Sequence, residues 1–336
     1  MSNRMRAVMV EEPGDVTALR MENVPEPEPA PDEVLIDVHY AACNWMDIEK
    51  RRGVYPDPSI TYPTCLGNEV SGRIEAIGSE VGDLAVGQRV AAIVRGGGYA
   101  ERCVASARLV IPLPDEISDE LGAAFPVVSL TAYHLLHTAH RLTANESILV
   151  HAIGGGVGLM LTQIARLIGA TVFGTVGHAG KGDRAIGFGA KRVVDRSEED
   201  FVEIVLAETN GRGVDLVIDS LGGETGYRSF DALRLYGRLI NIGEAEDWPK
   251  ENLRDKLYER STSFAGYETI HALQIPGAWQ ESVAYLVDAF AAGALQLPVA
   301  RTYDFEQSQQ MHSDLESRLV SGKLLLWMKS GASGAG

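Results

Sequence analysis

The chain has 336 residues, of which 45% are hydrophobic and 23% are charged, and its formal net charge at pH 7 is -16. This size and composition predict an ordinary soluble protein with a sizeable core and about two domains. The negative charge argues against nucleic acid as a partner, because a polyphosphate surface would repel it.

The sequence also gives no sign of membrane insertion or of secretion. Residues 1–10 contain no continuous apolar segment, and no run of about 18 apolar residues is present to span a bilayer. Cys43, Cys65 and Cys103 are odd in number and widely spaced, which argues against a disulfide framework. We therefore expect a cytoplasmic protein.

The N-terminal third predicts a compact antiparallel β-domain. Short apolar runs at residues 34–39, 70–77, 88–94 and 104–111 alternate with Gly and Pro, a spacing typical of antiparallel strands. The segment PEPEPAP at 25–31 is too rigid and too acidic for a core. We expect it to form a surface loop before the strand at 34–39.

From about Ser118 onward, longer helical patterns alternate with apolar strands. Strands separated by helices predict an α/β fold with a doubly wound parallel sheet. The expected strands are residues 147–153, 171–176, 192–195, 214–219 and 237–242.

The last part of the chain predicts one more helix and one more strand. Residues 307–319 have the pattern of an amphipathic helix, and residues 323–328 that of a strand. The tail SGASGAG at 330–336 is expected to be disordered.

The segment 147–169 predicts a dinucleotide-binding strand, turn and helix. An apolar run at 148–153 is followed by Gly154, Gly155, Gly156 and Gly158, and helical spacing covers 157–168. Glycines let the backbone approach a pyrophosphate, and the start of the helix stabilises its charge. The pattern GxGxxG is met only from its third position, because Ile153 stands where the first Gly belongs. A Gly-rich turn in any α/β sheet is the alternative interpretation.

The residues after the next two strands favour NADPH over NADH. In NAD-binding folds an acidic residue usually follows the second strand, about 20 residues beyond the turn. Here the strand at 171–176 ends without one, and the loop 177–181 brings Lys181, while the following strand ends next to Arg196. Two cations and small residues suit a 2'-phosphate. Taken singly, each basic residue is equally compatible with an exposed surface charge.

A set of motifs in fixed order resembles the zinc-free medium-chain dehydrogenases/reductases, most of all the quinone oxidoreductase and zeta-crystallin group. The resemblance covers nearly the whole chain, and although each motif is weak alone, their order is specific. The motifs are Asn44-x-x-Asp47 followed by Arg51, Gly53 and Tyr55, PTCLGNEVSG at 63–72, GQRV at 87–90, GGYAE at 97–101, LTA at 130–132, the Gly turn, DSLGG at 219–223, LESR at 315–318 and Gly322-Lys323.

The resemblance implies a particular domain organisation. Residues 1–125 would form a GroES-like β-barrel domain, residues 126–270 a Rossmann domain that binds NADPH, and residues 271–336 would return to the first domain. The family's active site lies in the cleft between the domains. The family also forms homo-oligomers, dimers or tetramers, through a sheet edge in a region like 261–267 here.

Functional residues follow from the chemistry of a site without a metal and from the resemblance. As hydrogen-bond donors to the acceptor we expect the Asn44 amide and the Tyr55 hydroxyl, with Asp47 orienting Asn44 or binding the cofactor ribose. The alternative interpretations are that Asn44 is a turn residue, Asp47 a helix cap and Tyr55 a half-buried loop aromatic. The NADPH contacts would be Asn44, Thr131, Gly155, Gly156, Val157, Ser220, Ile242 and Gly243, with Gly177, His178, Lys181, Arg196 and Arg318 around the 2'-phosphate.

Three positions depart from the family pattern. His178 stands where Ser is common and Arg196 where Tyr is common, and both keep or increase the means of binding phosphate. Glu49 stands where a quinone reductase often has Tyr, which leaves the substrate more open.

We expect no metal. Zinc-dependent relatives carry a Cys and a His at the positions of Asn44 and Asn68, and Asn is a poor zinc ligand. Cys43 is one position away and is expected to pack as a small apolar residue. His134, His137 and His140 are spaced so that they turn around a helix by about 60° per step, as ordinary helix positions do.

The function implied is an NADPH-dependent oxidoreductase that transfers a hydride to a quinone or a similar electrophilic carbonyl acceptor. An enoyl or alkenal C=C reductase of the same superfamily is the alternative within enzymes. A non-enzymatic NADPH-binding protein is the alternative outside them.

Overall fold

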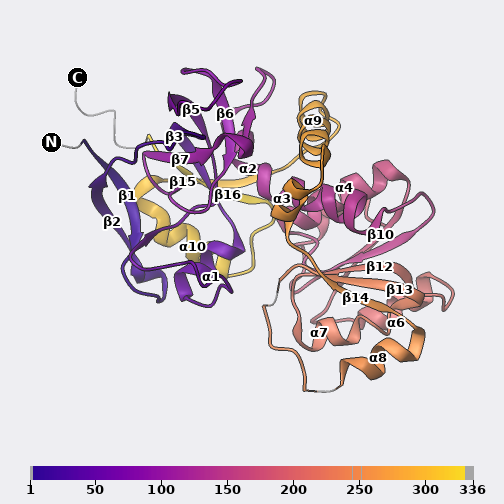
Figure 1. The fold of residues 1–336 in the computed structure, drawn as a ribbon. Helices are drawn as coiled ribbons and strands as arrows, with labels where there is room; N and C mark the ends of the chain where they lie inside the picture. Colours follow the sequence, from indigo (N-terminus) through magenta and orange to yellow (C-terminus); the bar gives the residue numbers. More distant parts are fainter. Residues whose placement is uncertain (1–2, 244, 251, 330–336) are drawn as a thin grey trace. The chain divides into compact units, whose positions relative to one another are not determined.

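The computed structural model describes residues 3–243, 245–250 and 252–329, so the predicted disordered tail lies outside the described residues. The chain divides into two compact units. Unit 1 comprises Met1–Val127 and Val287–Gly336, and unit 2 comprises Val128–Leu286. Figure 1 shows both, coloured along the sequence.

Unit 1 is built from two β-sheets. The larger has the strand order β15-β16-β3-β5-β6-β8, with β7 paired to β3, and the smaller has the order β2-β1-β4. The strands are β1 (Arg4–Val10), β2 (Leu19–Pro25), β3 (Glu33–Cys43), β4 (Thr64–Cys65), β5 (Glu69–Ile77), β6 (Arg89–Ile93), β7 (Arg102–Ser106), β8 (Val110–Pro112), β15 (Val299–Asp304) and β16 (Lys323–Trp327).

The last strand of the chain completes the first domain. β16 runs antiparallel to β3, with Leu324 opposite Cys43, and parallel to β15. Residues of these strands and of β5 form a common core that includes Val38, Ile74 and Leu326. Helix α1 (Trp45–Arg52) follows β3 directly, α2 (Asp119–Ala124) follows β8, and α10 (Ser308–Glu316) precedes β16. The two ends of the chain therefore form one body.

The predicted strand at 104–111 is wrong in one respect. The chain forms β7, a single 3-10 turn at Ala107–Leu109 and then β8. β7 pairs with β3, whereas β8 pairs with β6. The 3-10 turn lets the chain leave β3 after β7 and pair with β6 in β8. The other three predicted strands of this region are confirmed as β3, β5 and β6.

Unit 2 contains a six-stranded sheet in which every pairing is parallel. The strand order is β11-β10-β9-β12-β13-β14, which is the order 3-2-1-4-5-6 of a doubly wound sheet. The strands are β9 (Ser147–Val150), β10 (Thr171–Val176), β11 (Arg192–Asp195), β12 (Val214–Asp219), β13 (Leu233–Asn241) and β14 (Ser263–Gly266). The predicted α/β fold is confirmed.

Helices cover both faces of this sheet. In Figure 1, α6, α7 and α8 lie on one face and α3 and α4 on the other. The helices that lie wholly or mostly in unit 2 are α3 (Pro126–His134), which continues as a π-helix (Leu135–His140), α4 (Gly156–Ile168), α5 (Asp183–Gly187), α6 (Phe201–Glu208), α7 (Gly223–Arg228), α8 (Leu253–Arg260) and α9 (Ala278–Ala291). No helix among the described residues is long and apolar enough to cross a membrane.

The strand order reverses between β9 and β12. In open parallel sheets the carboxyl ends of the strands at such a reversal frame a crevice that takes ligands. The Gly turn follows β9 and the segment 220–223 follows β12, so the topology brings both to this edge.

Candidate active site and cofactor site

The Gly turn has the geometry of an anion-binding site. Gly155 is the N-cap of α4, whose first backbone N–H groups have no partner within the helix. A Cβ added at Gly158 would lie 2.5 Å from the Ile153 Cα atom. Only Gly permits this close packing of helix against turn. Gly156 and Val157 contribute further amides in the first turn.

Lys181 and Arg196 both lie at this edge of the sheet. A Cβ added at Gly154 would lie 2.3 Å from the Lys181 carbonyl oxygen, so the loop after β10 folds against the Gly turn. The Arg196 guanidinium is next to Gly177, since a Cβ there would lie 3.6 Å from its Nη2 atom. His178, in the same loop, is exposed. The loops that carry Lys181 and Arg196 therefore lie at the same edge of the sheet as the Gly turn.

A buried chain of hydrogen bonds, which sequence reasoning missed, holds Arg196. Its Nη1 atom donates to Thr175 Oγ1 at 2.6 Å, and Thr175 Oγ1 lies 2.8 Å from His151 Nδ1. His151 Nε2 lies 2.7 Å from Ser229 Oγ, which donates to the Thr225 carbonyl at 2.7 Å. Burial lowers the pKa of His151 to about 3, with a contribution from Arg196. The imidazole is therefore neutral. Each group in this series donates a hydrogen bond to the next, from the Arg196 guanidinium to the Thr225 carbonyl.

The carboxyl ends of β12 and β13 are joined by Asp219. This buried carboxylate accepts the Leu221 N–H at 2.9 Å and the Asn241 Nδ2–H at 3.1 Å. Asn241 Nδ2 also donates to the Gly243 carbonyl at 3.0 Å. Ser220, Ile242 and Gly243 are thereby fixed at the same edge as the Gly turn.

Two other predicted cofactor residues, Thr131 and Arg318, do not follow a strand of the parallel sheet. Thr131 is buried on α3, with its Oγ1 atom 2.8 Å from Thr269 Oγ1. Arg318 belongs to unit 1, where it has φ of 58° and its guanidinium lies 5.4 Å from the centre of the Trp45 ring.

In unit 1 the predicted catalytic residues Asn44 and Asp47 meet at the start of α1. Asn44 is the N-cap, and its N–H donates to Asp47 Oδ2 at 2.9 Å. Asp47 Oδ1 accepts the Gly67 N–H at 3.1 Å and an Asn68 Nδ2–H. Burial raises the pKa of Asp47 to about 6, although these bonds and Lys50 oppose the shift. Asp47 therefore ties α1 to the loop before β5.

The Asn44 side chain is fixed by a buried ion pair. Lys323 Nζ lies 2.7 Å from Glu69 Oε1, and the two side chains are 3% and 0% exposed. The same ammonium donates to Asn44 Oδ1 at 2.7 Å, and Asn44 Nδ2 donates to Glu69 Oε1 at 2.9 Å. Glu69 Oε2 accepts the Val127 N–H at 2.8 Å. The orientation of the Asn44 amide is therefore determined, and in the described part of the chain one of its two N–H groups remains for a ligand.

A second buried lysine binds the second asparagine. Lys50 Nζ donates to Asn68 Oδ1 at 2.6 Å and lies 5.2 Å from the centre of the Tyr55 ring. Lys50 is buried and Tyr55 is half-buried. Tyr55, the third predicted catalytic residue, is thus connected to Asp47 through Lys50 and Asn68. No role is predicted for Lys50 from the sequence.

A metal ion does not fit these residues. Each amide oxygen at the two family ligand positions, Asn44 and Asn68, already accepts a lysine ammonium group, whose charge opposes a dication. Cys43 packs in the core of unit 1, where burial raises the pKa of its thiol and disfavours the thiolate that binds zinc.

His134, His137 and His140 lie in unit 2, on α3 and on the π-helix that continues it. His137 stacks on the Tyr133 ring with centroids 4.2 Å apart, and burial lowers the pKa of His134 to about 4. Within 3–243, 245–250 and 252–329, no three His, Cys, Asp or Glu side chains form a metal-binding group.

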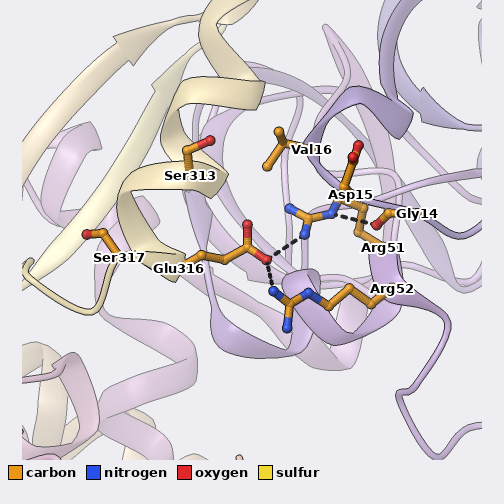
Figure 2. Close-up of a pocket in the computed structure, with 8 residues that line it drawn as sticks. All are labelled: Gly14, Asp15, Val16, Arg51, Arg52, Ser313, Glu316 and Ser317. Carbon is orange, nitrogen blue, oxygen red and sulfur yellow. Dashed lines mark hydrogen bonds and ion pairs between the residues drawn. The ribbon is translucent and has the colours of Figure 1, made fainter.

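A cavity of about 540 Å³ opens in unit 1 away from the predicted catalytic side chains. Figure 2 shows Arg51 and Arg52 converging on Glu316, with each guanidinium 2.6 Å from its Oε1 atom. Arg51 also contacts the buried His312 at 3.2 Å. The cations on the cavity wall are therefore paired, and this packing joins α1 to α10.

The comparisons with known proteins agree with this architecture. Residues 30–115 match the family model described as alcohol dehydrogenase GroES-like domain, and residues 156–286 match that of zinc-binding dehydrogenase. A quinone oxidoreductase of Salmonella typhimurium is 34% identical over 308 residues, which are 89% of this chain and 92% of the relative.

Solved structures are similar over almost their whole length. Escherichia coli quinone oxidoreductase complexed with NADPH has a TM-score of 0.90 at 30% identity, with 97% of this chain and 99% of that chain covered. CurK enoyl reductase has a TM-score of 0.87 at 26% identity, with 97% and 100% covered.

The chain also resembles part of a much larger protein. A phenolphthiocerol/phthiocerol polyketide synthase polypeptide of Mycobacterium tuberculosis is 31% identical over 320 residues. The match covers 95% of this chain but only 14% of that relative's length.

The buried ion pair leads to a prediction about stability. Lys323→Met should lower the free energy of unfolding by about 3 to 5 kcal/mol, because it leaves the Glu69 carboxylate buried without its cation. Adding Glu69→Gln should recover part of the loss. Lys329→Met is the matched control, since its half-exposed pair with Asp37 should contribute about 0 to 1 kcal/mol. Urea unfolding at pH 7 measures all four proteins, and equal losses for the two lysine variants would contradict the prediction.

The raised pKa of Asp47 leads to a prediction about pH. Between about pH 4 and pH 6 the folded protein keeps a proton on Asp47 that the unfolded chain releases, so this group lowers stability as pH rises. The change is on the order of 3 kcal/mol. Asp47→Asn should remove it, and the exposed Asp57→Asn should not. The measurement is the free energy of unfolding against pH; parallel curves for wild type and Asp47→Asn would disprove the assignment.

Proposed function

This chain belongs to the quinone oxidoreductase family of medium-chain dehydrogenases/reductases, and from that premise we propose that it transfers a hydride from NADPH to a quinone or similar electrophilic carbonyl acceptor without zinc. The proposal rests on the residues of each unit taken by itself. Unit 2 has a Gly turn at the start of a helix and two cations in the neighbouring loops, and unit 1 has a polar site whose residues do not suit a metal ion.

NADPH fits the residues of unit 2. The amides at 155–157 suit its pyrophosphate, and Lys181 and Arg196 suit its 2'-phosphate, which NADH lacks. The solved NADPH complex of a relative with the same fold supports this choice. We propose that Arg318 adds a further charge to the 2'-phosphate, and that Thr131, Ser220, Ile242 and Gly243 line the rest of the cofactor.

The bound cofactor would supply the hydride, and the acceptor must already be electrophilic. Simple alcohols need a Lewis acid to stabilise the alkoxide that releases hydride. Quinones and enones instead form delocalised oxyanions, which need only hydrogen-bond donors. We propose Asn44 and Tyr55 as these donors. Asp47 has no exposed surface, which favours its role in orienting Asn44 over ribose binding.

Reduction of an activated C=C bond is the second candidate. The similarity to CurK enoyl reductase and to part of a polyketide synthase supports it. A non-enzymatic NADPH-binding protein is the third, and it would bind the cofactor without turning it over.

We also propose a cytoplasmic homodimer. The three cysteines are free thiols, as suits a reducing compartment. β14 is the edge strand of its sheet, and Phe264 on it is 37% exposed. An edge strand with an exposed aromatic is suited to pairing with a second copy.

An acceptor screen tests the proposed function. With NADPH, a panel of small quinones should be reduced, and ethanol with NADP⁺ should give little activity. A chelator should change neither result. Turnover of enones alone would favour the second candidate, and cofactor binding without turnover would favour the third. Efficient, chelator-resistant oxidation of primary alcohols would refute the proposal.

The cofactor preference has its own prediction. Lys181→Ala combined with Arg196→Ala should weaken NADPH binding by about 100-fold or more, since each charge-assisted hydrogen bond contributes about 1.5 to 3 kcal/mol. NADH binding should hardly change. Fluorescence titration of both cofactors measures the effect, with Lys191→Ala, half-exposed and paired to Glu208, as control. Equal losses for both cofactors would place these residues outside the phosphate pocket.

A further inference from the structure

We propose that the ammonium group of Lys50 stabilises the negative charge that develops on the acceptor oxygen, in the part that a Lewis acid plays in zinc-dependent relatives. The inference rests on the proposed function and adds a residue to it. Lys50 does not belong to the motifs that identify the family.

The first observation is where the charge lies. Lys50 Nζ is 2.6 Å from Asn68 Oδ1, and Asn68 stands at the sequence position of a family zinc ligand. The Lys50 side chain approaches from the last turn of α1, the helix whose first turn carries Asn44 and Asp47. The positive charge thus lies beside one of the two asparagines at the family's zinc-ligand positions.

The second observation is that the ammonium group is held in place. Asn68 accepts from Lys50 through Oδ1 and donates to the Asp47 carboxylate through Nδ2, so the amide cannot reverse without breaking both bonds. Asp47 is itself fixed by the backbone N–H groups of Asn44 and Gly67. A group oriented before the reaction stabilises developing charge without further reorganisation.

The third observation connects this charge to the acceptor. The Lys50 ammonium faces the Tyr55 ring at 5.2 Å, and Tyr55 is a proposed donor to the acceptor oxygen. The ammonium group therefore lies near an oxygen that accepts from the Tyr55 hydroxyl, and its charge acts on that oxygen through space. Asp57 also lies within the electrostatic influence of Lys50, but its carboxylate is fully exposed and therefore strongly screened.

The chemical step balances with no further reagent. The acceptor would gain a hydride as the C–H bond that carries it in the reduced cofactor breaks, so that the cofactor would be oxidised and the acceptor would form a new bond to hydrogen. The π electron pair of the acceptor moves to its oxygen, where the Lys50 ammonium stabilises the charge. A proton from water then neutralises the anion, and Lys50 keeps its own protons.

Turnover of an acceptor series is the first measurement. Lys50→Met should lower kcat by about 100-fold or more, as removal of an oxyanion donor does in other enzymes. The loss should increase along a quinone series as the reduced product becomes a more basic anion. Lys50→Arg should restore part of the rate, and Arg52→Met, a half-exposed neighbour paired to Glu316, should behave as wild type.

Binding of 4-nitrophenolate in the presence of NADP⁺ is the second measurement and needs no turnover. The wild type should bind the phenolate at least 10-fold more tightly than Lys50→Met, as followed by its absorbance. NADPH affinity should be the same for both, which shows that the variant is folded. If Met prevents folding, Lys50→Gln provides the same comparison.

The outcomes separate the two proposals. Wild-type turnover together with unchanged kcat and unchanged phenolate binding in the Lys50 variants would overturn the role of Lys50 alone. Absence of turnover with every quinone and enone would overturn the proposed function. If no acceptor is turned over but phenolate binding still depends on Lys50, the Lys50 ammonium group would remain supported as the group that stabilises a bound oxyanion.

Discussion

The candidate active site of unit 1 depends on one buried ion pair, between Lys323 and Glu69. Both side chains lie out of water, where each charge costs several kcal/mol unless a partner compensates it. Lys323 begins β16 and Glu69 begins β5, and both strands flank β3. The pair forms only when the C-terminal strand has joined the N-terminal sheet. Placement of the Asn44 amide is therefore coupled to closure of the whole domain.

Unit 2 positions its site by backbone topology rather than by an ion pair. The parallel strand order brings the carboxyl ends of β9 to β13 to one edge, and the start of α4 supplies amides there. The chain as a whole carries a net charge of -16, which repels an anionic cofactor at long range. Lys181 and Arg196 must therefore act locally. The chain through His151 shows how the Arg196 guanidinium is held in place by a row of neutral hydrogen-bonding groups.

Local patterns in the sequence predicted most of the fold, because apolar strands of a parallel sheet are continuous and short. Strands 171–176, 192–195 and 214–219 agree with β10, β11 and β12 residue for residue. The break at 107–109 was not predictable, since it depends on which distant strands the chain pairs with. The motif residues Asn44 and Asp47 could be named in advance, but the partners of Asn44 could not. Lys323 is 279 residues away from it, and spacing carries no information at that range.

The two asparagines and the two buried lysines are best understood together. A dication and an ammonium group near the same amide oxygens would repel each other, so a site of this kind holds one or the other. An ammonium group is part of the chain and offers no open coordination position to a substrate oxygen. It stabilises charge that has formed, but it does not acidify a bound alcohol as a metal does. The residues that exclude zinc therefore also restrict the chemistry to acceptors that are electrophilic before they bind.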